Sequence, residues 1–342
     1  MTGAAGVLQR IDWDTDPADW DEAVRRCPGV TAFHSAGWLG AMAACFGASP
    51  VRARFWFADG AEAFVALSLR RLGGGWLPLA VAGETGVYGG VLAPGPLPPE
   101  HVAAVLEAVR RRHGAVRVFG NPFVPGGEAL PTSPPWRPLP QATHVLPLAG
   151  RDDPRQGFSR GCKARCNKAA KLGQEARWQE GRGAAEVFEP LYRDSVRRWG
   201  DRLTWERPRA FFEAVLGLAG AEARLVVVER RGEPVAAMLF LRWGSLVHYV
   251  AGASREDALP GCPSNLAMEA AITRYAAEGA TLLDMGPSSG LEGVARFKAS
   301  FGAQEVPYRG VEVLTWPLAA FLACRERLPS VTWRPAAAGA SA

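Results

Sequence analysis

The two halves of this 342-residue chain share one order of predicted elements. In each half, helical segments lead into strands joined by tight turns, and a loop, a helix and a short strand follow. The turn is Asp59-Gly60 in the first half, a strong hairpin signal, and Arg231-Gly232 in the second. This period is far too long for a solenoid. It predicts two copies of one α+β domain in tandem.

Helix and strand boundaries follow from apolar periodicity, capping residues and turn residues. Ser35 is a suitable N-cap for a helix that ends at Gly47. The other predicted helices cover residues 16–27, 99–113, 154–171, 187–199, 208–217 and 264–278. The predicted strands cover residues 51–57, 61–69, 76–82, 115–119, 223–229, 234–243, 246–251 and 281–285. A proline-rich stretch, residues 121–140, separates the halves.

Composition places the chain among ordinary soluble proteins. Hydrophobic residues make up 48% and charged residues 21%, which is enough apolar content for two cores. The formal charge of +5 suits an anionic substrate or a nucleic-acid partner without requiring either. No apolar run reaches the length of a membrane span, so we expect no membrane insertion.

The six cysteines do not form the paired spacing of a zinc site. Cys162 and Cys166 are four residues apart, but the surrounding arginines and lysines would repel a cation. We therefore expect no metal. Because no secretory leader is evident, we expect reduced thiols and a cytoplasmic protein.

The stretch 281–303 holds the main candidates for a site. It is predicted to run from a buried strand ending at Asp284, through a loop rich in glycine, proline and serine, into a short helix that carries Arg296 and Lys298. Phe297 anchors the helix, and Gly302 is a suitable left-handed stop. Such an arrangement suits an anionic ligand, although a strand, loop and surface helix without a ligand would look the same.

Several short sequence motifs along the chain resemble those of a known superfamily. The first half contains Phe33 to Trp38 (FHSAGW) followed by Phe46-Gly47. The second contains RCNKAAKLG from Arg165, YVAGAS from Tyr249 and FKASFGA from Phe297. In these motifs and in its repeated element order, the chain resembles the Fem-type (FemABX-like) peptidyltransferases and the BioF2-like acetyltransferases of the GNAT superfamily. The resemblance covers nearly the whole chain.

The resemblance implies two tandem GNAT-like (acyl-CoA N-acyltransferase) domains, each a mixed sheet flanked by helices. We expect an N-terminal domain over residues 1–148, with residues 315–330 as a candidate to pack back on it. A C-terminal domain over residues 149–314 would hold the active groove. In this fold a splayed pair of strands leaves backbone groups free to bind an acyl group.

The implied activity is acyl transfer to an amine, forming an amide. The expected donor is aminoacyl-tRNA as a co-substrate, with no tightly bound cofactor. The expected acceptor is a small molecule or peptide, such as a cell-wall precursor or a natural-product intermediate. The alternatives are an N-acetyltransferase that uses acetyl-CoA or another acyl-CoA, and a non-catalytic protein that binds tRNA or a peptide.

The resemblance also implies roles for particular residues. Lys298 would bind phosphate or stabilise charge at the reacting carbonyl. The substrate channel would be lined by second-half residues: Tyr249, Phe297, Ser195, Arg198 and Arg296. Tyr88, in the glycine-rich loop of the first half, lines a groove in one interpretation and packs in the core in another.

Two candidates have a second interpretation. Asp284 is either a general base for the attacking amine or, as strand-end acids usually are, a cap on the following turn. A basic helix bears the residues expected to contact tRNA phosphates, or alternatively presents a solvated face: Lys163, Arg165, Lys168 and Lys171.

Two features bear on the choice of donor and acceptor. Ala41-Met42 stands where wall-precursor enzymes of this superfamily commonly place a lysine. The loop 255–265, where a GNAT enzyme would bind the CoA pyrophosphate, has one glycine, two prolines and two acids. Prolines have no N–H that could bind an anion. We therefore rank acetyl-CoA below aminoacyl-tRNA as the expected acyl donor.

Overall fold

The computed structural model describes residues 7–84, 86–125, 127, 129–151, 153–200 and 206–327. The chain divides into two compact units. The first comprises the residues up to Ala142 and those from Pro307 onward, and the second is Thr143–Val306. The chain passes between the units along β6 (Arg137–Pro147) and β12 (Gln304–Val313). The boundaries between the units therefore fall inside these two strands.

The sheet of the first unit has the strand order β1-β2-β3-β4-β5-β12. Its strands are β1 (Leu8–Asp12), β2 (Ser49–Phe57), β3 (Glu62–Leu72), β4 (Leu77–Ala82), β5 (Val116–Phe119) and β12. The strands from β1 to β4 pair antiparallel, β4 and β5 pair parallel, and β12 pairs antiparallel with β5. The sheet is therefore mixed.

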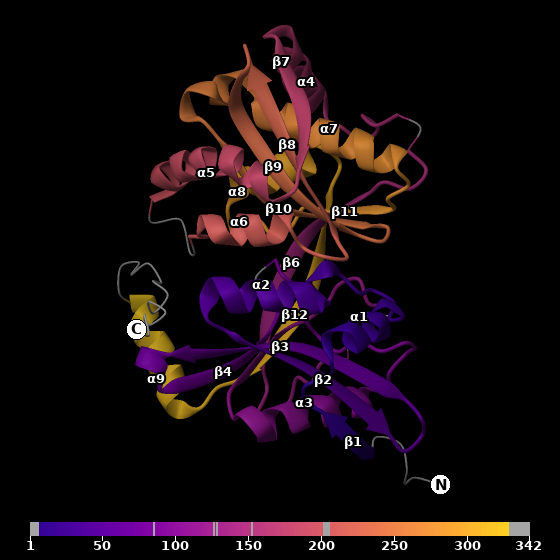
Figure 1. Ribbon diagram of the computed structural model, residues 1–342. Helices are drawn as coiled ribbons and strands as arrows, with labels where there is room; N and C mark the ends of the chain where they lie inside the picture. Colours follow the sequence, from indigo (N-terminus) through magenta and orange to yellow (C-terminus); the bar gives the residue numbers. More distant parts are fainter. Residues whose placement is uncertain are drawn as a thin grey trace. The chain divides into compact units, whose positions relative to one another are not determined.

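Helices cover both faces of the first unit's sheet (Figure 1). They are α1 (Pro17–Arg25), α2 (Ala36–Phe46), α3 (Pro99–His113) and α9 (Trp316–Arg327). Side chains alternate along β4, so Ala80 and Ala82 join the core with α3, whereas Leu79 and Val81 pack with Leu318 of α9. Trp20 of α1 and Leu39 of α2 pack on β3.

Local sequence determines the edges of these elements as expected. Ser35 Oγ accepts a hydrogen bond from the Trp38 N–H at 3.1 Å, which caps α2. Gly47 ends that helix with a φ of 64°. In the hairpin between β2 and β3, the Asp59 carboxylate accepts from the Ala61 N–H, and Gly60 has a φ of 85°.

The sheet of the second unit has the order β6-β11-β10-β9-β8-β7. The strands not yet given are β7 (Gln174–Glu180), β8 (Glu222–Arg230), β9 (Glu233–Trp243), β10 (Leu246–Ser254) and β11 (Leu282–Asp284). All neighbours pair antiparallel except β10 and β11, which are parallel. Both units are thus mixed sheets flanked by helices, which confirms the predicted α+β class.

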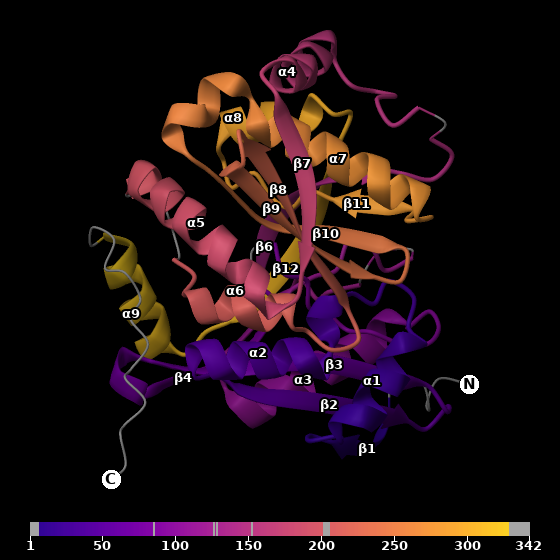
Figure 2. The same ribbon diagram turned by 45° about the horizontal axis from the view of Figure 1, so that its top comes forward.

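Helices α4 (Arg160–Lys171) and α7 (Pro263–Ala277) lie on one face of this sheet, and α5 (Ala185–Trp199) and α6 (Arg209–Leu216) on the other (Figure 2). The short α8 (Glu292–Ala299) follows β11. Ser159 caps α4 by accepting from the Cys162 N–H, so the helix begins at Arg160 and not near Pro154 as predicted.

Four strands were not predicted: β1, β6, β7 and β12. Pro138 and Pro140 in β6 made that segment resemble a loop, and alternating charges masked β7. The pairing that forms these strands comes from partners distant in the sequence. None of the helices in the described part of the chain combines the length and the apolar character needed to cross a bilayer.

Candidate functional site

Strands β10 and β11 run side by side for three residue pairs only. Leu246 pairs with Leu282, Val247 with Leu283, and His248 with Asp284. At Asp284 β11 ends, while β10 continues to Ser254. Beyond His248 the edge of β10 that faced β11 therefore no longer has this strand as a partner. This opening is the geometry that an acyl group needs in order to bind backbone N–H or C=O groups.

A β-bulge lies at the start of this opening. On β9, Phe240 pairs with Tyr249 and the next residue, Leu239, pairs with Ala251, so Val250 is an extra residue in β10. A bulge bends its strand and turns a backbone group away from the ladder. Bulge and opening together mark residues 249–254 as the candidate binding edge.

A buried network surrounds the end of β11. Asp284 is 2% exposed, and its carboxylate contacts Thr143, Gly286 and His248. Oδ1 accepts from Thr143 Oγ1 at 2.6 Å and from the Gly286 N–H at 3.0 Å, and Oδ2 lies 2.9 Å from His248 Nδ1. The Gly286 contact is the turn cap that the sequence favoured for Asp284. The carboxylate thus holds both the turn and the imidazole of His248.

Lys298 is 3% exposed and belongs to the same region. Its Nζ donates to the carbonyl oxygens of Gly286 at 2.7 Å and Pro287 at 2.6 Å. Burial lowers the pKa of Lys298 to about 8, and the charge of Asp284 opposes that shift. The ammonium group is therefore anchored on the loop that leaves β11, with its proton easier to lose than in water.

His144, at the other side of β11, completes the network. The His144 N–H donates to the Gly286 carbonyl at 3.1 Å, and its carbonyl accepts from the Met285 N–H at 2.7 Å. Burial and the charge of Lys298 lower the pKa of the His144 imidazole, while Glu305 raises it. Among the residues described, no three His, Cys, Asp or Glu side chains are placed to hold a metal ion.

The Tyr249 side chain packs against the core of the second unit, and its hydroxyl lies beside Gly252. A Cβ built on Gly252 would lie 2.1 Å from Tyr249 Oη, so the hydroxyl occupies the space of a side chain at position 252. Burial raises the pKa of the Tyr249 phenol to about 12, and Arg207 opposes the shift. The hydroxyl therefore stays protonated and can act as a hydrogen-bond donor.

Ser195 and Arg198 of α5 both bind the end of β10. Ser195 Oγ accepts from the Ser254 N–H at 3.0 Å, and Arg198 Nη1 donates to the Ser254 carbonyl at 3.1 Å. Their contacts fasten the last residue of the strand, so the structure gives both residues a supporting place at the binding edge.

The remaining candidates are not part of the network. Phe297 is partly buried and stacks edge-on against Phe301, with ring centroids 5.1 Å apart. Arg296 is exposed and pairs with Glu292 of the same helix. Tyr88, in the first unit, is 1% exposed among aromatic rings that include Phe123, so its contacts are those of a packing residue.

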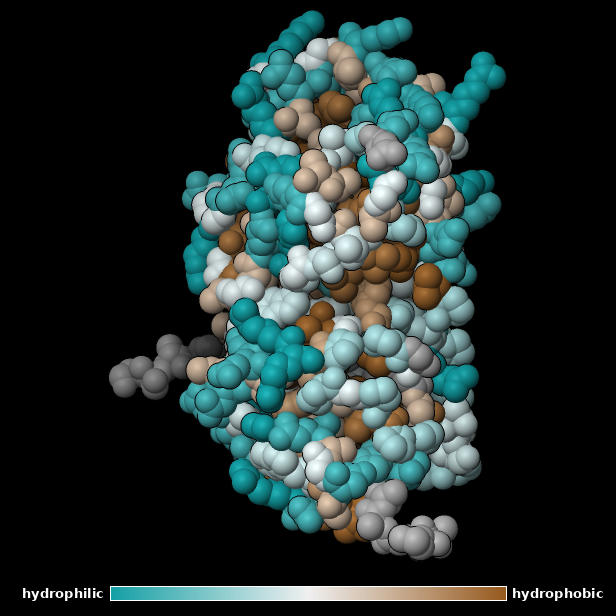
Figure 3. Space-filling view, turned by 90° about the vertical axis from the view of Figure 1, so that its right-hand side faces the viewer, coloured by the Kyte–Doolittle hydropathy of each residue, from teal (hydrophilic) through white to brown (hydrophobic). Residues whose placement is uncertain are grey.

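The basic helix is α4, and its two faces differ. Cys162, Cys166 and Ala169 are buried against the sheet. The outer positions are basic: Arg165, Lys168 and Lys171 are exposed and Lys163 is half-buried. On the face that Figure 3 shows, hydrophilic side chains predominate at the top of the second unit, where Figure 1 places α4, with apolar ones among them.

The connection from β10 to α7 is a 3₁₀ helix, η5 (Glu256–Gly261). It begins with two acids, Glu256 and Asp257, and α7 begins at Pro263 with no side-chain cap. Asp257 pairs with Arg255, so an incoming pyrophosphate would meet the Glu256 carboxylate and one missing N–H here.

Sequence reasoning missed His248, His144 and Thr143 as parts of the site. Thr143 and Asp284 are 141 positions apart in the chain and meet only because β6 pairs with β11. The alternation of His248 within an apolar strand was the one available signal, since it predicts a side chain on the buried face.

Comparison with known proteins agrees with this geometry. Residues 158–299 match the family model described as an acetyltransferase (GNAT) domain. The crystal structure of FemX is similar over 92% of this chain and 100% of FemX, with a TM-score of 0.64 and 14% identity. The chain has a Fem-like GNAT fold.

A second solved structure is also similar to the chain in fold. L-PGS from Bacillus licheniformis matches 93% of this chain and 98% of its own, with a TM-score of 0.57 and 14% identity. Among curated proteins, none matches the chain in sequence. The matched GNAT segment contains β10, β11 and Lys298, so the family match falls on the candidate site. Fold and family match together support an amide-forming acyltransferase.

Proposed function

We propose that this protein transfers an aminoacyl group from aminoacyl-tRNA to an amine acceptor. The observation that carries the proposal is the opening between β10 and β11, with the buried Lys298 beside the turn that follows β11. Backbone groups of residues 249–253, on the edge of β10 that β11 no longer covers, would hold the acyl carbonyl, and Tyr249 would donate a hydrogen bond to the donor.

The chemistry needs no covalent enzyme intermediate, because an aminoacyl ester is already activated. The amine nitrogen attacks the ester carbonyl, the C–O bond breaks, and the 3′-terminal ribose hydroxyl of the tRNA leaves with a proton. Lys298 would stabilise the negative charge that develops on the carbonyl oxygen. Asp284, whose oxygens already accept three hydrogen bonds, would position His248 and the Gly286 turn rather than act as the base.

Two observations favour tRNA over acetyl-CoA as the donor. The outer face of α4 presents exposed cations that suit a phosphate backbone. The start of α7, where a CoA pyrophosphate would bind, has acids and prolines in its approach. Positioning and charge stabilisation, without a bound cofactor, are then sufficient for the transfer.

The second candidate is an acetyl-CoA-dependent N-acetyltransferase. The specific observation in its favour is the matched family model, whose description is an acetyltransferase domain. A non-catalytic protein that binds tRNA or a peptide is the third.

One experiment separates these candidates. The protein is incubated with aminoacyl-tRNA or with acetyl-CoA, each with a panel of peptide and small-molecule amines, and loss of the acyl group is followed by mass spectrometry. We expect transfer from aminoacyl-tRNA. Turnover of acetyl-CoA alone would establish the second candidate, and tRNA binding without any transfer would establish the third.

A further inference from the structure

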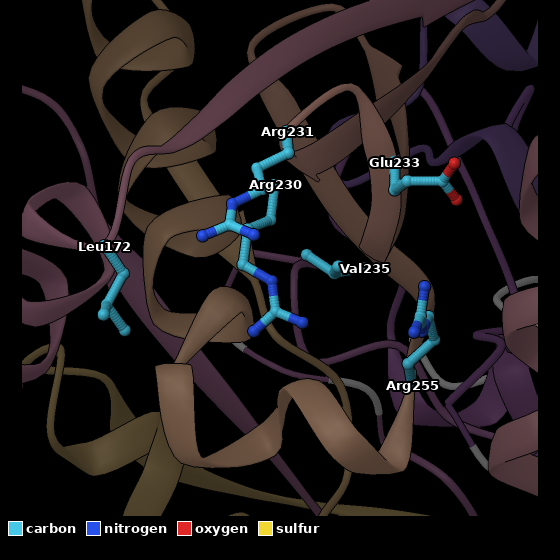
Figure 4. A pocket seen from close by; sticks show the side chains of 6 residues that line it. All are labelled: Leu172, Arg230, Arg231, Glu233, Val235 and Arg255. Atoms are coloured by element: carbon cyan, nitrogen blue, oxygen red, sulfur yellow. The ribbon is translucent and has the colours of Figure 1, made fainter.

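A pocket rich in arginine lies at the turn between β8 and β9, outside the network around Lys298. It encloses about 430 Å³, within the size range of ligand pockets. Six residues line it: Leu172, Arg230, Arg231, Glu233, Val235 and Arg255. In Figure 4 the guanidinium groups of Arg230 and Arg231 lie between Leu172 and Val235, and the Glu233 carboxylate points away from them.

The charges of this pocket do not cancel. Asp257 binds Arg255 through Nε at 3.0 Å and Nη2 at 2.8 Å, and lies 3.6 Å from Arg230. Arg231 takes part in no ion pair among the residues that the structure describes. Three arginines and one acid, Glu233, thus line the pocket, Asp257 pairs with two of the arginines, and the exposed Lys171 precedes Leu172 at the rim. The net charge around the pocket is therefore positive, which favours binding of an anion.

The backbone conformation at Arg231 also supports a role of this pocket in binding an anion. Arg230 pairs with Glu233, so Arg231 and Gly232 form a two-residue turn, with φ values of 56° and 78°. Such a turn favours asparagine, aspartate or glycine at both positions, because a long side chain at positive φ is strained. An arginine at position 231 therefore lowers the stability of the turn, and its guanidinium lies over the pocket.

We propose that this arginine pocket binds a phosphate group of the acyl donor. The inference rests on the proposed function for the identity of the donor, but the pocket's chemistry is independent of it. Guanidinium groups bind phosphate oxygens in a bidentate manner. The cations of α4 lead to the rim at Leu172, so an RNA backbone lying on α4 could place one phosphate in the pocket.

The test measures binding, not activity. Fluorescence anisotropy with a labelled RNA minihelix of acceptor-stem sequence compares the wild type with the double variant Arg230→Gln/Arg231→Asn over a salt series. Asparagine suits the positive φ, so the turn is retained, and circular dichroism checks the fold. The matched control is Arg193→Gln, an exposed arginine of α5 that is paired with Glu189. Calorimetry with CoA provides the second arm.

We expect the double variant to bind the minihelix about tenfold or more weakly, and the control to match the wild type. The salt slope of the double variant should be lower by about one for each phosphate that its side chains no longer neutralise. Unchanged minihelix binding in the double variant would overturn the proposal. If only CoA binds the wild type, and the double variant does not bind it, the pocket is supported while tRNA as donor is contradicted. Binding of neither probe by the wild type would overturn both.

Discussion

His248 Nδ1 lies 2.9 Å from Asp284 Oδ2, and both side chains are almost completely buried. This contact joins β10 to β11 at the last pair before the strands separate. It therefore lies where the opening begins. Lys298, held by Gly286 and Pro287, fixes the loop on the far side of the same turn.

Asp284→Ala should destabilise the protein more than Asp284→Asn. The alanine variant leaves the Thr143 hydroxyl, the Gly286 N–H and the His248 imidazole without their buried acceptor, which we expect to cost about 3 kcal/mol or more. Asparagine keeps an oxygen for Thr143 and Gly286 and should cost less than half as much. Urea unfolding followed by circular dichroism measures both. Equal losses in the two variants would show that the network does not support the turn.

Activity should fall as pH rises above about 8. Burial lowers the pKa of Lys298 to about 8, so the ammonium that stabilises charge is lost in that range. Lys298→Arg, which stays charged, should retain activity at higher pH. The measurement is kcat/KM as a function of pH for both proteins. If kcat/KM declines over the same alkaline pH range in both proteins, the decline is due to a group other than Lys298.

The stability of the protein should respond to pH in the opposite sense. The folded pKa of Lys298, about 8, lies below its ordinary value of 10.5, so the unfolded chain binds more protons between these pH values. The contribution of Lys298 to the free energy of unfolding therefore increases as pH rises from about 8 to 10.5. The difference between wild type and Lys298→Met over this range isolates that contribution. A difference that is constant with pH would contradict the shift.

Gly252→Ala should disturb Tyr249, because the new methyl group would lie 2.1 Å from the Tyr249 hydroxyl. We expect a loss of about 1–3 kcal/mol in the free energy of unfolding. The double variant Tyr249→Phe/Gly252→Ala should recover part of it, because the nearest remaining ring atom is 3.1 Å away. A double-mutant cycle measures the coupling between the two positions. If the losses in free energy of unfolding are strictly additive, the Tyr249 hydroxyl does not lie beside Gly252.

The sequence was sufficient for elements whose signals are local. Ser35 and Gly47 delimited α2, and Asp59-Gly60 located the first hairpin, because caps and turns depend on a few neighbouring residues. It was insufficient for β6 and β12, whose pairing depends on remote strands. For the same reason Lys298 and Asp284 could be singled out from their own segment, whereas Thr143 could not.

The central claim is that Lys298, at the opening between β10 and β11, supports transfer from aminoacyl-tRNA to an amine. The most direct measurement is single-turnover amide formation from aminoacyl-tRNA, quantified by mass spectrometry for wild type and Lys298→Met, with circular dichroism confirming that both are folded. We predict amide formation by the wild type and a loss of about 100-fold or more in the variant. Equal rates in the two proteins, or amide formed from acetyl-CoA and not from aminoacyl-tRNA, would contradict the account.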